Sequence, residues 1–251
     1  MSQAWVLGQR ALREGWRTPE ALLPTLFIPL FFLVVNVGQA ARIFPAASTG
    51  FLHGQGYGAF QLPASLLLAG SFGTAALFLV EEIEGGYFDK LRATPVSRTA
   101  IVLGRLIAEG VKGLLIASLL VLLGLAFGIR IASGPLGFVL LVLLTAMWAV
   151  VYSGFMQIIA LKTRSAAATN SAGLVFFPLL FLTPNFVPRD LLTRPMEIAA
   201  TFNPVTYVME ALRSLILEDL RWTPILLGFL VVAIAGAIML AVSVRLIRTY
   251  D

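Results

Sequence analysis

The chain has 251 residues, of which 59% are hydrophobic and only 12% are charged, and its mean hydropathy is +0.91. Soluble domains carry about 25% charged residues, so this composition excludes an ordinary soluble protein and indicates a membrane protein. The net charge of +5 fits attraction to an anionic membrane surface and not nucleic-acid binding, because no basic face remains in water. With no cysteine, disulfides and thiolate metal sites are also excluded.

The first 18 residues predict a helix that lies in the membrane interface. At 100° per residue, Trp5 and Trp16 fall on one face and Arg10, Arg13 and Arg17 on another. The tryptophans would enter the membrane lipid while the arginines reach lipid phosphate. The alternative is a short tail whose periodicity arises by chance.

Six apolar stretches follow, each at least as long as the roughly 20 residues that cross about 30 Å of hydrocarbon as a helix. They are predicted at residues 22–41, 58–80, 101–129, 137–161, 166–187 and 223–244. The fold class is therefore an all-α integral membrane protein with six transmembrane helices in one domain. In the third span, Arg105, Glu109 and Lys112 are interpreted as a snorkelling ion-pair set at shallow depth, with a proton relay as the alternative.

The distribution of positive charge predicts the orientation of the spans. Twelve of the 18 Lys and Arg residues fall on one side of the membrane: in both terminal segments, in the segment between the second and third spans with the first turns of the third, and in the loop after the fourth. Because positive residues favour the cytoplasmic side, both termini are predicted to be cytoplasmic.

The segment between the second and third spans, "EEIEGGYFDKLRATPVSR", is unusually charged. Its centre predicts a short helix, with Glu84 near the positive end of the helix dipole and Arg92 near the negative end. Three apolar side chains share one face of it: Tyr87, Phe88 and Leu91. Such a face suits a groove in another protein. The alternative is a loop that folds back onto the membrane interface.

A second informative segment, residues 188–221, precedes the last span. Pro188 disfavours a continuous helix, whereas Asn203 followed by Pro204 predicts a helix N-cap with proline in the first turn. In the helix that follows, the apolar residues repeat at helical spacing. The charged residues Glu210, Arg213 and Glu218 are expected to face elsewhere.

Two motifs resemble those of one family. The sequence "LRATPVSR" followed by "IVLGRLIAE", and the distant "NFVPRDLLTRPMEIAATFNPVTYVMEALR", are similar to patterns of type-2 ABC exporter permeases, which include bacterial daunorubicin-resistance permeases. The resemblance covers essentially the whole chain and implies a bacterial cell-membrane location. It implies that residues 84–94 form a coupling helix seated in a cytoplasmic ABC ATPase subunit. It also implies that the outer segment, including Tyr207, forms short re-entrant helices, the alternative being an ordinary interfacial helix.

The resemblance places ATP and magnesium on the partner subunit and no cofactor on this chain. The sequence agrees with the absence of an ATP site of this kind, because none of the three lysines lies in the Gly-Lys-Ser/Thr context of a phosphate-binding loop. We therefore expect a transport subunit and not an enzyme. A second permease copy or close paralogue is expected to complete a dimer.

The predicted function is ATP-driven export of a hydrophobic or amphiphilic compound, a drug or a lipid. The candidate pathway residues are Phe27, Phe31, Asn36, Phe176, Phe177 and Phe181. One alternative is export of a lipid-linked glycan or polysaccharide. Another is a secondary transporter, for which buried carboxylates or paired discontinuous helices are expected at the membrane midplane. An intramembrane enzyme is a weaker alternative, because no nucleophile, base and metal ligands converge in the sequence.

Overall fold

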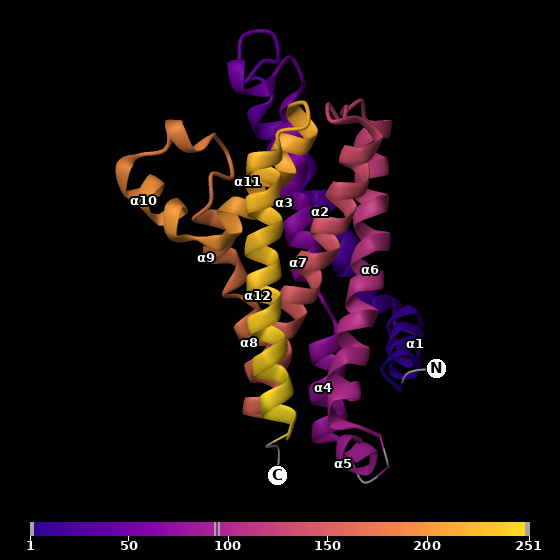
Figure 1. Cartoon of the computed structure of the whole chain (residues 1–251). Coiled ribbons are helices and arrows are strands. Elements are labelled where there is room, and N and C mark those ends of the chain that lie inside the picture. The colour runs from indigo at the N-terminus through magenta and orange to yellow at the C-terminus, as the bar shows by residue number, and fades with distance from the viewer. Residues whose placement is uncertain (1–2, 93, 95, 249–251) are drawn as a thin grey trace.

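The computed structural model describes residues 3–92, 94 and 96–248, which form an elongated bundle of helices (Figure 1). The long helices are α2 (Pro19–Ala40), α6 (Arg98–Ala126), α7 (Gly134–Thr163) and α12 (Trp222–Arg248). The shorter ones are α1 (Gln3–Arg17), α3 (Tyr57–Ser71), α4 (Ala75–Glu84), α5 (Tyr87–Arg92), α8 (Ala166–Gly173), α9 (Phe176–Phe181), α10 (Arg194–Phe202) and α11 (Pro204–Leu217), with the 3-10 turns η1 (Gly50–Leu52) and η2 (Arg189–Leu191). The predicted all-α class is confirmed for this part of the chain.

Five helical segments of the described chain are long and apolar enough to cross a membrane. They cover the predicted spans 1, 2, 3, 4 and 6. The predicted fifth span is instead divided between the short helices α8 and α9. The chain still runs along the bundle here, because α7 ends near α5 whereas α12 begins at the opposite end (Figure 1). The count of six membrane crossings stays a prediction.

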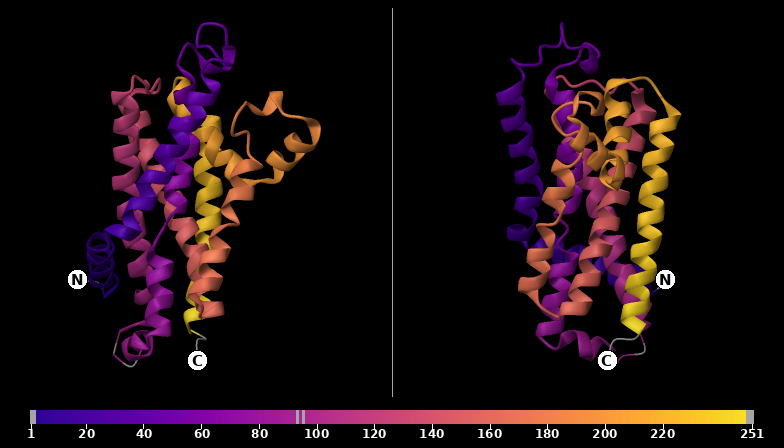
Figure 2. Two further views of the ribbon diagram at one scale, coloured as in Figure 1. Left: turned by 180° about the vertical axis from the view of Figure 1, so that it is seen from behind. Right: turned by 90° about the vertical axis from the view of Figure 1, so that its left-hand side faces the viewer.

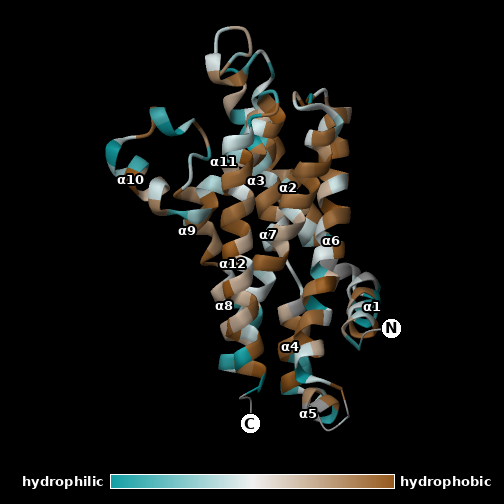
Figure 3. Ribbon diagram, in the orientation of Figure 1, coloured by the Kyte–Doolittle hydropathy of each residue, from teal (hydrophilic) through white to brown (hydrophobic). Residues whose placement is uncertain are grey.

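We call the end of the bundle that carries α5 and the last turns of α12 the α5 end, and the opposite end the α11 end (Figure 1). Apolar residues follow the long helices, while polar residues gather on α1, around α10 and toward the two ends (Figure 3). Outward-facing side chains of α2 and α12 include Phe27, 64% exposed, and Leu226, 59% exposed. An apolar outer surface of this extent belongs in lipid or against another subunit.

The helix α3 forms the centre of the bundle, and nearly all of its residues are buried. It packs against α2, α6, α7 and α11. At Gly70 a side chain is excluded, because a Cβ there would lie 2.9 Å from Cδ1 of Trp148. The Trp148 indole then donates a hydrogen bond to Ser71 Oγ at 2.9 Å, which satisfies a polar group that has no access to water.

The helix α1 lies outside the bundle and packs against α6 (Figure 2). Glycine allows the close approach: a Cβ on Gly104 would lie 2.8 Å from Leu7 Cβ. Trp5 is 41% exposed, whereas the Trp16 side chain lies outside the described part. The predicted helix is present, and its contact with lipid stays a prediction.

The second predicted span is interrupted, because α3 ends at Ser71 and α4 begins at Ala75. The interruption leaves backbone groups without helical partners, a cost that side chains offset. Thr25 on α2 donates to the Phe72 carbonyl at 3.3 Å. Glu109 of α6 accepts from the Thr74 amide at 3.2 Å. The break is therefore held by neighbouring helices.

Candidate functional site

Two clusters of buried charge lie on α4 and α6. In the first, Lys112 donates to Glu109 Oε1 at 2.6 Å and to Thr74 Oγ1 at 2.8 Å. Glu109 and Lys112 are 3% and 7% exposed, so their charged groups do not reach water as the predicted snorkelling set would, and their shallow depth stays a prediction. Their location beside the α3–α4 break explains the burial, because the break needs polar partners and α6 supplies Glu109 to the Thr74 amide.

The second cluster is centred on Glu82 of α4, which is 8% exposed. Its Oε1 accepts from Arg10 Nη2 of α1 at 2.7 Å, and its Oε2 accepts from Arg105 Nη2 of α6. One carboxylate thus joins α1, α4 and α6. The predicted pair of Glu109 with Lys112 is present. The carboxylate that Arg105 contacts was not predicted: packing of α4 on α6 brings Glu82 to it.

The predicted coupling segment forms α5, a six-residue helix at the tip of the α5 end (Figure 1). Its expected three-residue exposed face is not formed. Phe88 is 0% exposed within a cluster that includes Leu79 and Ile101, and Leu91 is partly buried against the same cluster. Tyr87 is 43% exposed, with the Arg10 guanidinium 4.7 Å from its ring centroid. Phe88 therefore secures α5 to the bundle, whereas Tyr87 stays exposed.

Two further members of the predicted coupling set differ in their placement. Glu84 ends α4, and its Oε1 accepts from the Ala166 amide at the start of α8 at 2.8 Å. A carboxylate suits this place because the start of a helix carries partial positive charge. The chain then turns at Gly86, with φ of 69°. The side chain of Arg92 lies outside the described part.

The candidate pathway residues lie at separate places in the described part of the chain. Phe27 and Phe31 stack on the exposed side of α2, with ring centroids 5.9 Å apart. Phe176 is buried against Trp148, at 6.1 Å between centroids. The remaining three are Asn36, which is half-buried and donates to Gln61 at 3.5 Å, Phe177, which packs on the core, and Phe181, which is exposed.

The segment before the last span packs into the α11 end of the bundle. As predicted, Asn203 caps α11 by accepting from the Val205 amide at 3.0 Å, and Pro204 is the first helical residue. Asn203 also donates to the Leu179 carbonyl at 2.6 Å. The helix α11 packs against α3, α7 and α12 and is buried on most sides, so the alternative of an ordinary interfacial helix is disfavoured.

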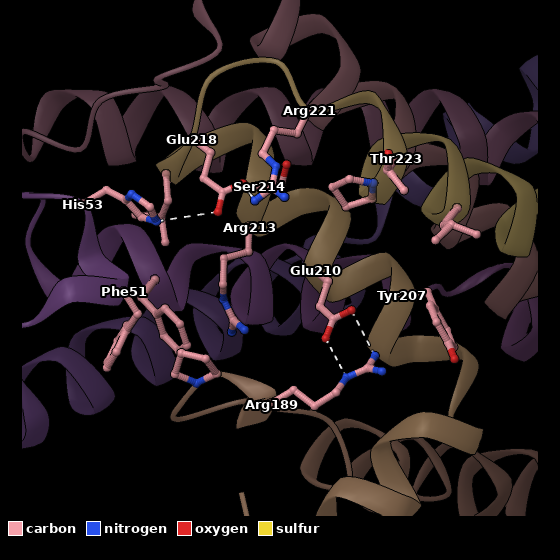
Figure 4. A pocket seen from close by; sticks show the side chains of 15 residues that line it. Phe51, His53, Arg189, Tyr207, Glu210, Arg213, Ser214, Glu218, Arg221 and Thr223 are labelled. Atoms are coloured by element: carbon pink, nitrogen blue, oxygen red, sulfur yellow. Dashed lines mark hydrogen bonds and ion pairs between the residues drawn. The ribbon is translucent and has the colours of Figure 1, made fainter. Parts of the chain in front are cut away.

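A cavity of about 540 Å³ opens beside α11. Its charged and polar lining comes from the loop before α3, from η2, from α11, and from the turn into α12 and its first residues (Figure 4). Arg189 of η2 forms a bidentate pair with Glu210, at 2.9 and 3.0 Å. Its guanidinium also lies 5.4 Å from the Tyr207 ring centroid. Pro188 completes this wall. The sequence singled out Pro188, Tyr207 and Glu210, but neither Arg189 nor the cavity.

Arg213 is the most unusual residue of this cavity, and it is only 8% exposed. From the sequence, Arg213 is expected to point away from the apolar face of α11. This expectation is wrong, because the side chain is buried. The guanidinium lies 3.6 Å from the Phe60 ring centroid, and Nη1 donates to the Pro184 carbonyl at 2.9 Å. Burial lowers the pKa of Arg213 to about 9, although Glu210 opposes this shift. At neutral pH the side chain stays positively charged.

Three donor atoms at the cavity have no hydrogen-bond partner among the described residues: Nε and Nη2 of Arg213 and Oγ of Ser214. Within the described chain, no group of three His, Asp or Glu residues is placed to hold a metal ion. The α11 end thus presents polar donors, and an aromatic and apolar wall, without a metal cluster.

These features define the class of protein: a multi-pass helical membrane protein with a small protruding helix at one end and a polar cavity at the other. The family model for the ABC-2 type transporter matches residues 2–217. The chain belongs to this family and is an ABC transporter permease, which confirms the resemblance seen in its two motifs.

Among curated proteins, the chain is similar to the daunorubicin resistance ABC transporter permease protein DrrB1 of Streptomyces coeruleorubidus. The two are 25% identical over 213 residues, which cover 82% of this chain and 72% of the relative.

Proposed function

We propose that this permease exports a hydrophobic or amphiphilic compound, a drug or a lipid, powered by ATP hydrolysis in a separate subunit. Membership of the ABC-2 family is the observation that carries the proposal. The similarity to a daunorubicin resistance permease favours a drug-like substrate. The apolar outer surfaces of α2 and α12 agree with a membrane pathway for compounds that partition into lipid.

The α5 end is proposed to face the cytoplasm and to bind the ABC ATPase. The helix α1 and the last turns of α12 lie toward this end (Figure 1), in agreement with the positive charge that predicts a cytoplasmic side. The exposed Tyr87 provides an aromatic contact, a residue type enriched at interfaces. Because Arg10 contacts both Tyr87 and Glu82, movement of α5 is coupled to α1, α4 and α6.

Two copies, or this chain with a close paralogue, are proposed to form the complete pathway. The exposed aromatic side of α2, including Phe27 and Phe31, supports a contact between permease chains. A cell-membrane location in a bacterium completes the proposal, supported by the Streptomyces origin of the relative. Native mass measurement of the purified complex tests the stoichiometry, and one permease per pair of ATPases would contradict it.

The coupling proposal is tested by comparing two exposed aromatic residues at opposite ends. Tyr87→Ala should reduce co-purification of the ATPase and reduce transport together, while the permease remains at normal abundance. Phe127→Ala is the matched control, because Phe127 is 80% exposed and follows α6 at the α11 end. Equal ATPase binding by the two variants would contradict docking at α5.

The substrate is tested by reconstituting the permease with its ATPase in vesicles. Stimulation of ATP hydrolysis is compared among an anthracycline drug, a phospholipid and a lipid-linked glycan. We expect the drug or the phospholipid to stimulate more than the glycan. A response to the glycan alone would replace the proposed substrate class.

A further inference from the structure

We propose that the cavity beside α11 binds the anionic head of an amphiphile, a carboxylate or phosphate ester, through Arg213 and Ser214. The site is distinct from the α5 end, and binding to it needs neither ATP nor an ATPase. The proposal therefore goes beyond the exporter function and can fail independently of it.

Charge balance is the first argument. The cavity is lined by three arginines and two glutamates, which leaves one positive charge when His53 is neutral. Glu210 pairs with Arg189, while Glu218 lies 3.1 Å from Arg221 and 3.6 Å from His53. No carboxylate of the described chain forms an ion pair with Arg213, so the surplus charge is located on this residue.

Unused donors are the second argument. The Arg213 guanidinium makes one hydrogen bond, to Pro184, and keeps Nε and Nη2 without partners in the part of the chain that the structure describes. The hydroxyl of the adjacent Ser214 is also unused. Buried donors are normally satisfied, and a buried charge is costly without a partner. An oxyanion accepts from a planar guanidinium fork and a hydroxyl together.

The remaining wall indicates the rest of the ligand. Phe51, Pro188 and Leu227 line the same cavity, and Leu227 of α12 is 43% exposed. In the close view, the Arg213 side chain extends into the space between the Phe51 side and the Arg189–Glu210 pair (Figure 4). A ligand with an anionic head at Arg213 would therefore place its apolar body toward α12. A purely inorganic anion would leave this wall unused.

Binding is tested with the purified full-length permease in a neutral detergent, using dodecyl phosphate as the probe. We expect Arg213→Gln to weaken dodecyl phosphate binding by on the order of tenfold or more, because charged hydrogen bonds are lost. Arg194→Gln is the matched control, since the Arg194 side chain is 78% exposed, pairs with Glu197 and does not line the cavity. Equal loss in both variants, or in neither, would overturn the proposal.

A second measurement leaves Arg213 in place, in case its variant does not fold. The natural chain has no cysteine, so Thr223→Cys introduces one label at an exposed residue of the cavity lining. Dodecyl phosphate should slow its reaction with a neutral maleimide. Ser48→Cys, at an exposed residue outside that lining, should react at an unchanged rate. Similar slowing at both positions, or at neither, would contradict a specific site.

Two further arms define the ligand. Inorganic phosphate should protect Thr223→Cys only at much higher concentration than dodecyl phosphate, and equal potency would overturn the amphiphile assignment. Vesicles of phosphatidylcholine with and without phosphatidylglycerol then distinguish the source. Slower labelling with phosphatidylglycerol supports a bilayer lipid. Equal rates, with protection by added dodecyl phosphate, support a dissolved amphiphile.

Discussion

Arg105 at the α5 end and Arg213 at the α11 end are buried to nearly the same degree, at 6% and 8% exposure. Arg105 contacts the carboxylate of Glu82, which also binds Arg10. Arg213 has a backbone carbonyl and an aromatic ring but no ion pair within the described residues. Burial of a charge is thus not by itself a sign of ligand binding. The difference lies in the partners: a paired charge connects helices, and an unpaired one has donors left for a ligand.

The largest effect is expected from Glu82→Gln, which removes the carboxylate between two arginines. Breaking a buried ion pair from one side costs about 4 kcal/mol, so thermal unfolding in detergent should occur at a clearly lower temperature. Glu81→Gln is the control, because Glu81 is the exposed neighbour. Equal unfolding temperatures for the two variants would show that the Glu82 cluster does not stabilise the α5 end.

A somewhat smaller loss is expected from Phe88→Ala, which tests the apolar part of the α5 end. Truncating a fully buried phenylalanine costs about 3 kcal/mol or more through lost burial and a cavity, so permease abundance and unfolding temperature should both fall. Tyr87→Ala should leave unfolding nearly unchanged while it weakens ATPase binding. If Phe88→Ala kept a normal unfolding temperature and lost only its binding of the ATPase, the prediction from the sequence that Phe88 docks on the ATPase would be supported.

Arg213→Met should change stability by less than about 1 kcal/mol, because an apolar side chain of similar length replaces a buried charge without an ion pair. Dodecyl phosphate should raise the unfolding temperature of the natural protein, since a ligand stabilises the folded state to which it binds. It should not raise that of the variant. A destabilisation as large as that of Glu82→Gln would show that Arg213, like Arg105, has a structural role.

The smallest effect is expected from Arg194→Gln. The pair with Glu197 is exposed on α10, at 2.8 Å, and surface ion pairs contribute about 0.5 kcal/mol or less. Its unfolding temperature should match that of the natural protein within error, both in low salt and in high salt. A large shift would mean that α10 is held by this pair, and the variant would no longer serve as a neutral reference for Arg213.

Much of the fold was accessible from the sequence because its signals are local. Apolar length predicted the helices that became α2, α6, α7 and α12. The cap of α11 was predicted from the adjacent Asn203 and Pro204, and its hydrogen bond joins residues two apart. Spacing also indicated a short helix between the second and third spans, although α5 begins only after Gly86.

The candidate site was less predictable, because its geometry comes from residues far apart in the chain. Glu82 meets Arg105 across 23 residues and Arg10 across 72, distances at which helical periodicity carries no information. Pairing Glu109 with Lys112 was predicted from their spacing, but their burial within the bundle was not. This burial depends on the break between α3 and α4, which brings Thr74 to both side chains.

By itself, the sequence determined that this protein is an α-helical membrane permease. Hydropathy and the two motifs depend only on residues that are contiguous in the chain, so they do not require knowledge of the packing. Only the tertiary structure decided which side chains of a helix are buried. Packing of α5 on the bundle enclosed Phe88 and left Tyr87 exposed. Packing of α11 against α3 placed Arg213 over Phe60. A charged residue on a helix prefers water until neighbouring helices enclose it, and the arrangement of those neighbours is a property of the whole fold.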